Sequence, residues 1–200
     1  MERRQPRGSR AGLTLMEMMI ALTILSLVMA NVTMATRAGS KAYQAGTFAN
    51  HMEEQVDQTM DRISFALMAS SPDLIDPVPV APNYSSSIDY EVSLGYEDGD
   101  LVLADPERIE FQAATGQIRW VQNPLMAHER SLVWSNWVAE QLEGEELNGK
   151  DDNANGLSDE SGLAFNMDGN KITIHLTIRR TNADGLVQEQ TKRAQVTCRN

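Results

Sequence analysis

The pattern of apolar and polar positions divides this chain into a long uncharged run, an amphipathic stretch and a β-rich remainder. Residues 18–36 contain no charged side chain and consist mostly of Leu, Ile, Val, Met and Ala. At 1.5 Å per residue, about 20 such residues in a helix cross a hydrocarbon core of roughly 30 Å. We therefore expect a membrane-spanning helix over residues 13–36.

The helix is predicted to continue beyond the apolar run, because apolar residues recur there at three- and four-residue spacing. Glu53, Glu54 and Asp57 fall outside this stripe, and Ser71 and Pro72 form a stop signal. We expect an amphipathic helix over residues 37–70. Its apolar stripe comprises Ala38, Ala42, Ala45, Phe48, Ala49, Met52, Val56, Met60, Ile63 and Leu67.

The remainder of the chain, residues 71–200, has the composition of an irregular connection followed by short strands. Residues 72–87 hold four prolines and three serines and predict a connection without regular structure. Short runs of strand composition then alternate with turn residues such as Asp98, Gly99 and Gly116. The predicted strands are 88–94, 101–104, 108–112, 117–122 and 130–134.

The clearest strand covers residues 171–180, where Ile172, Ile174 and two further apolar residues alternate with polar ones. Turn-forming residues 182–185 separate it from residues 186–198, which predicts an antiparallel hairpin. His175 falls on the polar phase and is expected on the surface. A long helix packed on a small antiparallel sheet makes the predicted fold class α+β.

Charge is distributed unevenly along the chain. The net charge is −11, yet residues 1–12 carry four arginines against one acid, so this stretch is +3 and the remainder is −14. An acidic remainder argues against a nucleic-acid partner, which requires clustered Lys and Arg. The arginines before the apolar run predict a cytoplasmic N-terminus and an extracytoplasmic remainder by the positive-inside rule.

Glu17 lies at the start of the apolar run, where a carboxylate is costly. Its cost at a bilayer centre is about 2.5 to 3.5 kcal/mol, so a function is expected for it. One alternative is a cleaved secretory signal with a cut after Ala30 or Ala35, which Glu17 would weaken. Another is a plain signal anchor with Glu17 near the membrane interface.

The segment Gly12-Leu13-Thr14-Leu15-Met16-Glu17 and the apolar run after it resemble the prepilin cleavage and methylation site of type IV pilins and type II secretion pseudopilins. The resemblance implies that a prepilin peptidase removes the basic leader, residues 1–12, by cutting after Gly12 and methylates the new amine of Leu13. Glu17 becomes the fifth mature residue, whose carboxylate meets the terminal amine of a neighbouring subunit.

Two departures from the family pattern bear on the type of subunit. The first mature residue is more often Phe, and many major pilins have a proline late in the spanning run, whereas this chain has none between Pro6 and Pro72. The missing kink favours a minor component, and residues 194–200 resemble the last strand of J-type minor pseudopilins. The resemblance implies a single-pass inner-membrane protein with a periplasmic C-terminal region that joins other pilins or pseudopilins in a filament.

A second motif lies in residues 148–162, here called the acidic loop. Its segment from Asp151 to Gly156 matches D-x-[DN]-x-[DN]-G, in which alternate side-chain oxygens converge on calcium while glycine makes the turn. The twelfth position is Gly162 instead of Glu, and no helices frame the loop, so an EF-hand is not expected. A solvated acidic turn is the alternative. The predicted ligands are Asp151, Asn153, Asn155, the Leu157 carbonyl, Asp159 and Glu160.

No enzymatic motif accompanies these features. His51 and His128 are scattered and expected on the surface, Cys198 is expected to be inert, and the three tryptophans are expected to pack in the β-rich region. We therefore predict a structural pseudopilin and no catalysis. The alternatives are a membrane-anchored, calcium-stabilised binding module that forms no filament, and an exported hydrolase.

Overall fold

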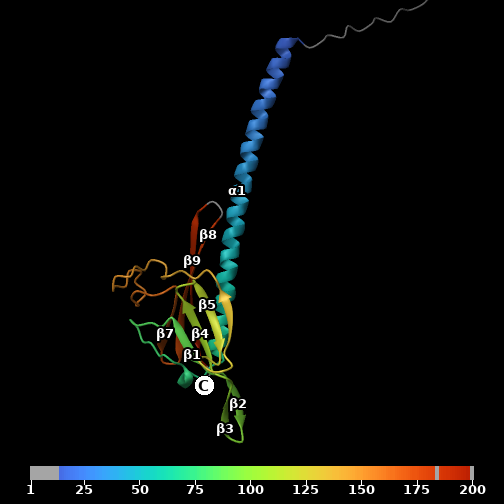
Figure 1. Cartoon of the computed structure of the whole chain (residues 1–200). Coiled ribbons are helices and arrows are strands. Elements are labelled where there is room, and N and C mark those ends of the chain that lie inside the picture. The colour runs from blue at the N-terminus through green and yellow to red at the C-terminus, as the bar shows by residue number, and fades with distance from the viewer. Residues whose placement is uncertain (1–13, 183–184, 199–200) are drawn as a thin grey trace, which may run out of the picture. The chain divides into compact units, whose positions relative to one another are not determined.

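The computed structural model describes residues 14–182 and 185–198, which separate into two units at the boundary between Thr47 and Phe48. We call the second unit, residues 48–198, the head. Helix α1 runs through both units, and every strand belongs to the head (Figure 1). The elements are α1 (Leu15–Met68), the 3-10 helix η1 (Pro72–Leu74), β1 (Ser87–Tyr90), β2 (Ser93–Glu97), β3 (Asp100–Leu103), β4 (Glu107–Gln112), β5 (Gln117–Gln122), β6 (Arg130–Ser135), β7 (Leu163–Asp168), β8 (Lys171–Thr181) and β9 (Val187–Thr197).

Helix α1 confirms the predicted continuous helix and ends within two residues of the predicted stop. Its last turn closes where the Ser70 amide and hydroxyl both donate to the Leu67 carbonyl, at 3.2 and 2.6 Å. Pro72 then opens η1. Within the head, the predicted stripe faces inward, and its buried members are Met52, Val56, Met60, Ile63 and Leu67.

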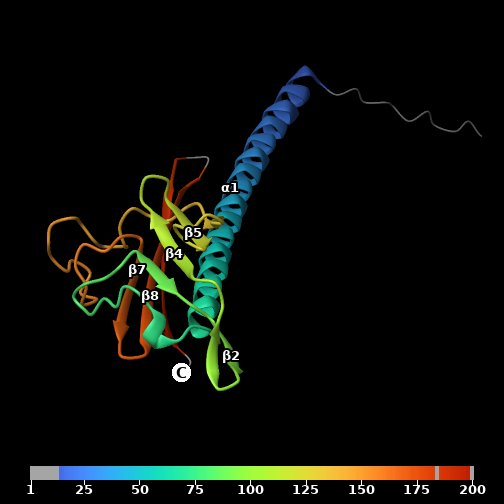
Figure 2. The same ribbon diagram turned by 60° about the horizontal axis from the view of Figure 1, so that its bottom comes forward.

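The strands form three antiparallel sheets in the orders β1-β4-β5-β6, β2-β3 and β7-β8-β9 (Figure 2). The β8–β9 hairpin confirms the predicted one and pairs over eleven residues in each strand, from Lys171 opposite Thr197 to Thr181 opposite Val187. At the β2–β3 turn, Asp98 and Gly99 both have positive φ, as a two-residue hairpin turn requires. The architecture is the predicted α+β class.

One hydrophobic core joins the head half of α1 to the four-stranded and three-stranded sheets. The helix contributes Val56 and Ile63, and the sheets contribute Ile109, Phe165 and Ile174, all of them fully buried. Trp120, Trp134 and Trp137 pack against this core, as predicted. All three tryptophans therefore report on the head.

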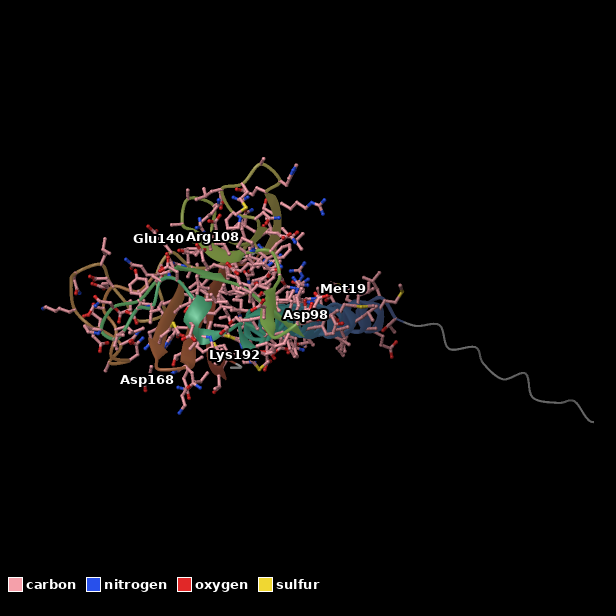
Figure 3. All side chains as sticks on the ribbon, turned by 90° about the horizontal axis from the view of Figure 1, so that it is seen from below. Met19, Asp98, Arg108, Glu140, Asp168 and Lys192 are labelled. Carbon is pink, nitrogen blue, oxygen red and sulfur yellow. The ribbon has the colours of Figure 1, made fainter. Side chains whose placement is uncertain are left out.

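Polar contacts hold the outer surfaces of the head together, and Figure 3 marks two of the residues involved. Arg108 on β4 donates to both carboxylate oxygens of Asp89 on β1, at 2.5 and 2.7 Å. Lys192 on β9 forms an ion pair with Asp57 on α1. These pairs connect neighbouring elements at the edge of the core.

Three sequence predictions for the head were incomplete or wrong. Residues 88–94 do not form one strand, because β1 ends at Tyr90 and β2 begins at Ser93 in a different sheet. Strand β7 was not predicted at all. His175 is not a surface residue, since only 4% of its area is exposed.

His175 is buried because β8 is the central strand of its sheet and is covered on both faces. Residues 172–178 are all buried. The Glu143 amide donates to the Thr177 hydroxyl at 3.1 Å, so the segment before the acidic loop covers the face of β8 on which its polar side chains lie. Burial, with a smaller contribution from Arg193, lowers the His175 pKa to about 4. The histidine is therefore neutral at physiological pH.

Candidate functional site

The first candidate site is the start of α1, where the predicted processing and assembly residues lie. Gly12 and Leu13 fall outside the described residues, whereas Thr14 and Glu17 are described. The Thr14 amide and hydroxyl donate to Glu17 Oε2 at 2.8 and 2.9 Å, and the Glu17 amide donates to Thr14 Oγ1 at 3.3 Å. This reciprocal pattern is a capping box that satisfies the first amides of the helix.

The capping box explains how a carboxylate is accommodated at the start of an apolar helix. Its signal, a threonine followed three residues later by glutamate, is present in the sequence but was not recognised. Both donations to the Glu17 side chain end on Oε2, and no described residue donates to Oε1. A second oxygen of Glu17 is therefore available to another group.

The helix after the capping box exposes its whole apolar surface. Within the described residues, α1 is the one helix long and apolar enough to cross a membrane, with a window of mean hydropathy 2.0 of which none is buried. Thirteen large apolar residues of this segment are at least half exposed. They are Leu15, Met16, Met18, Met19, Ile20, Leu22, Ile24, Leu25, Leu27, Val28, Met29, Val32 and Met34. Such a surface is typical of a membrane or partner interface.

The second candidate site is the acidic loop, which the fold closes at its base. Gln141 and Ser161 form an isolated bridge, and the Leu142 amide donates to the Glu160 carbonyl at 2.9 Å. A Cβ atom on Gly162 would lie 2.0 Å from the Ala139 carbonyl oxygen, so the two chain segments approach too closely for a side chain. This contact explains why glycine occupies the twelfth motif position.

Within the loop, the motif side chains organise the backbone. Asp151 accepts the amides of Asn155 at 3.1 Å and Gly156 at 2.9 Å, and Asn153 Oδ1 accepts the Asn155 amide at 3.1 Å. Asn155 Oδ1 in turn accepts the Leu157 amide at 2.8 Å, and Gly156 has a φ of 91°. These hydrogen bonds fix Asp151, Asn153 and Asn155 around the Gly156 turn.

Two buried glutamates lie beneath these residues. Glu160 is fully buried, and its Oε1 accepts the Asn155 side-chain amide at 2.5 Å. Glu145 is 6% exposed and accepts the amides of Asp152, Asn153 and Asp159 at 3.0, 2.9 and 3.2 Å. Burial raises the Glu160 pKa, and the neighbouring Glu145 carboxylate adds to this increase.

Glu145 is a loop residue that the sequence did not indicate. It precedes the motif by six positions, and only the folded loop brings its carboxylate under the motif backbone. Asp159, a predicted ligand, accepts the amides of Asn148 and Gly149 at 2.7 and 2.8 Å and so braces the start of the loop. Among the described residues, no group of three or more His, Cys, Asp or Glu side chains is already placed to hold a metal ion.

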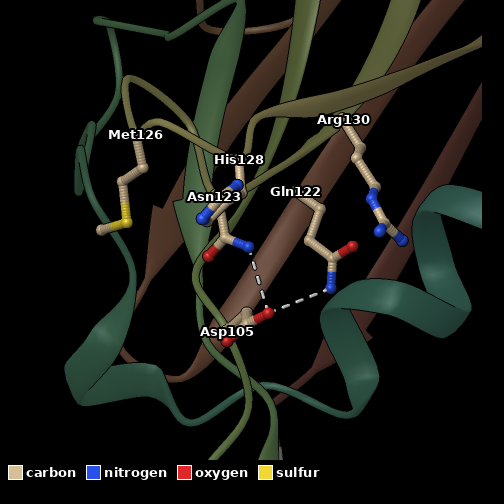
Figure 4. A pocket seen from close by; sticks show the side chains of 6 residues that line it. All are labelled: Asp105, Gln122, Asn123, Met126, His128 and Arg130. Atoms are coloured by element: carbon tan, nitrogen blue, oxygen red, sulfur yellow. Dashed lines mark hydrogen bonds between the residues drawn. The ribbon is translucent and has the colours of Figure 1, made fainter.

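A third feature is an open cavity formed by the loop before β6 and the end of β5. Asp105 lines it and accepts hydrogen bonds from the side chains of Gln122 at 3.3 Å and Asn123 at 3.1 Å (Figure 4). Met126, His128 and Arg130 complete the lining and are exposed. The internal pairing of Asp105 accounts for this cluster without a ligand.

Cys198 lies apart from these three features. Its side chain is buried, and the Ser70 hydroxyl donates to its sulfur at 3.8 Å. Burial raises the pKa of this thiol and so disfavours the reactive thiolate. Both observations agree with the expectation of an inert residue.

Comparison with known proteins gives a family match that falls on the first candidate site. Residues 7–30 match the family model of the prokaryotic N-terminal methylation motif. No curated protein and no solved structure matches the chain. The match supports a type IV pilin-like protein that is processed by a prepilin peptidase and anchored in a membrane by its apolar helix.

Proposed function

We propose that this chain is a minor pseudopilin, a structural subunit of a type II secretion or type IV pilus-like filament. The observation that carries the proposal is the methylation motif at residues 7–30, continuous with a helix whose large apolar residues from Leu15 to Met34 are all at least half exposed. A helix of this kind requires lipid before assembly and neighbouring apolar helices after it. The arginines of the leader favour a cytoplasmic N-terminus and a periplasmic head.

Glu17 has two roles in this proposal. Its Oε2 caps α1 through Thr14, and its Oε1 accepts the methylated amine of Leu13 from the adjacent subunit. Two charges that are costly apart in an apolar bundle become tolerable when paired, which sets the register between subunits. The capping role is local, whereas the pairing role exists only in the filament.

The variant Glu17→Gln separates these roles, because glutamine retains the capping acceptor but removes the charge. We expect the variant to be cleaved after Gly12 but to fall at least about tenfold in crosslinked or sheared filament fractions from cells with the cognate machinery, given the cost of an unpaired amine. Glu53→Gln, at an exposed position of the same helix, is the matched control and should assemble normally.

Normal assembly of Glu17→Gln would contradict the pairing role and leave Glu17 as a helix cap. A chain that is neither cleaved nor incorporated would instead favour a membrane-anchored binding module that forms no filament. A minor subunit should also be present in far fewer copies than the major one. Counting subunits in purified filaments by quantitative mass spectrometry tests this part of the proposal.

A further inference from the structure

The acidic loop contains a buried polar atom that the protein does not satisfy. Glu160 is fully buried, with 0% of its area accessible to solvent. Its Oε2 has no hydrogen-bond partner among the described residues. A buried polar group without a hydrogen-bond partner destabilises the fold, and does so more strongly when it is charged. The closed loop therefore leaves a buried carboxylate oxygen without a hydrogen-bond donor.

Glu160 is directed toward the motif and not away from it. Its other oxygen, Oε1, accepts the side-chain amide of Asn155, the fifth motif residue. Glu145, also buried, lies beside it, so two carboxylates share one enclosed site. Two carboxylates at such a site repel each other unless a proton or a cation lies between them.

The residues around this oxygen have the chemistry of a hard-cation site. Calcium takes six to eight oxygen ligands at about 2.3 to 2.6 Å from carboxylates, amide side chains and carbonyls. Asp151, Asn153 and Asn155 offer such oxygens at alternate positions around the Gly156 turn. A divalent cation would neutralise the charge of Asp151 and Glu160 together.

We propose that the loop binds one calcium ion through Glu160, the side-chain oxygens of Asp151, Asn153 and Asn155, and the Leu157 carbonyl. Glu145 holds the loop backbone beneath the ion through its three amide contacts, and Asp159 braces the start of the loop. Glu160 replaces the bidentate glutamate of an EF-hand, whose position Gly162 cannot supply. Because the loop closes over β8, calcium stabilises the head.

The test is calorimetric titration of calcium into the full chain, purified in detergent and freed of metal with a chelator. We expect one site with a Kd of about 0.1 to 1 mM, the range of extracellular modules. At 5 mM calcium, the tryptophan-detected unfolding temperature should rise by roughly 3 to 8 °C. Magnesium at the same concentration should give less than half of this shift, because it requires a smaller octahedral site.

Variants of the loop identify the ligands. Glu160→Gln can donate to Glu145 and so keeps the loop closed, but it should weaken calcium binding at least about tenfold, as loss of a charged ligand does. Asp151→Asn, at an exposed position, should also weaken binding and provides a second test if the first variant unfolds. Asp152→Asn makes the same charge change at a non-ligand position and should bind within about threefold of wild type.

Absence of calcium binding in the wild-type chain would overturn the inference, as would equal weakening by Glu160→Gln and Asp152→Asn. The inference does not depend on the filament role, because binding is measured on the unprocessed chain. A chain that binds calcium but is never cleaved would refute the proposed function and leave this site intact.

Discussion

Residues 15–36 and the head differ in the solvent exposure of their large apolar side chains. In the first region every large apolar residue is exposed, and in the head the corresponding residues of α1 are buried against two sheets. One helix therefore has a half that is complete within the chain and a half that requires another environment. The difference indicates that folding stability resides in the head and that the apolar segment requires a membrane or a partner surface.

The largest effect on unfolding free energy is expected when one isoleucine in each region is replaced by alanine. Ile63→Ala removes a fully buried side chain and should lower the free energy of unfolding of the head by about 2 to 5 kcal/mol. Ile24→Ala, at a position that is 58% exposed, should change it by less than about 0.5 kcal/mol. Urea unfolding of the full chain in detergent, followed by tryptophan fluorescence, measures both. Equal effects would show that the two regions fold as one unit.

The next effect concerns the pH dependence of the head. His175 has a pKa of about 4 in the folded chain and 6.5 when unfolded, so between these values the unfolded chain binds the extra proton. Stability conferred by neutral His175 is complete above pH 6.5 and falls as the pH drops toward 4. At pH 4.5 the loss relative to pH 7 should be about 2 kcal/mol.

His175→Gln should abolish this part of the pH dependence, so that the difference in unfolding free energy between wild type and variant decreases on acidification. His128→Gln, at an exposed position, is the control and should follow the wild-type curve. Urea unfolding at pH 7 and pH 4.5 makes the comparison. Parallel curves for wild type and His175→Gln would contradict the assignment of His175 as a buried neutral group.

The smallest effect on stability is expected at an exposed ion pair on the surface of the head. Lys192 and Asp57 pair between β9 and α1, with side chains that are 41% and 48% exposed. Lys192→Met should cost only about 0.2 to 1 kcal/mol, and less at high salt, because solvent and ions screen an exposed pair. Unfolding measured at low and high ionic strength tests this, and a cost above 2 kcal/mol that is independent of salt would contradict it.

The two regions also differ in how well the sequence predicted them. The helix, its stop at Pro72 and the β8–β9 hairpin follow from local periodicity and were predicted correctly. Strand β7 was missed because its sequence, LAFNMD, is buried at four of six positions and lacks alternation. Its pairing with β8 and with Ser85 is set by tertiary contacts that no local pattern contains.

The same distinction applies to the candidate sites. Glu17 was found from the motif, but its capping role was overlooked although Thr14 supplies the signal. The alternating residues of the acidic loop were found from spacing, whereas Glu145 and the unpaired oxygen of Glu160 emerge only when the loop closes. His175 was assigned wrongly because alternation was equated with one solvent-exposed face. Chemistry set by neighbours in sequence is predictable, and chemistry set by neighbours in space is not.

The proposed function requires that a prepilin peptidase cleaves the chain after Gly12 and methylates Leu13. Intact mass of the chain, expressed with and without a prepilin peptidase, tests it most directly, with Gly12→Ala as the matched variant. We predict loss of residues 1–12 and gain of one methyl group on Leu13, both dependent on the peptidase and both abolished by the substitution. An unchanged mass under conditions that process a known prepilin would contradict the account.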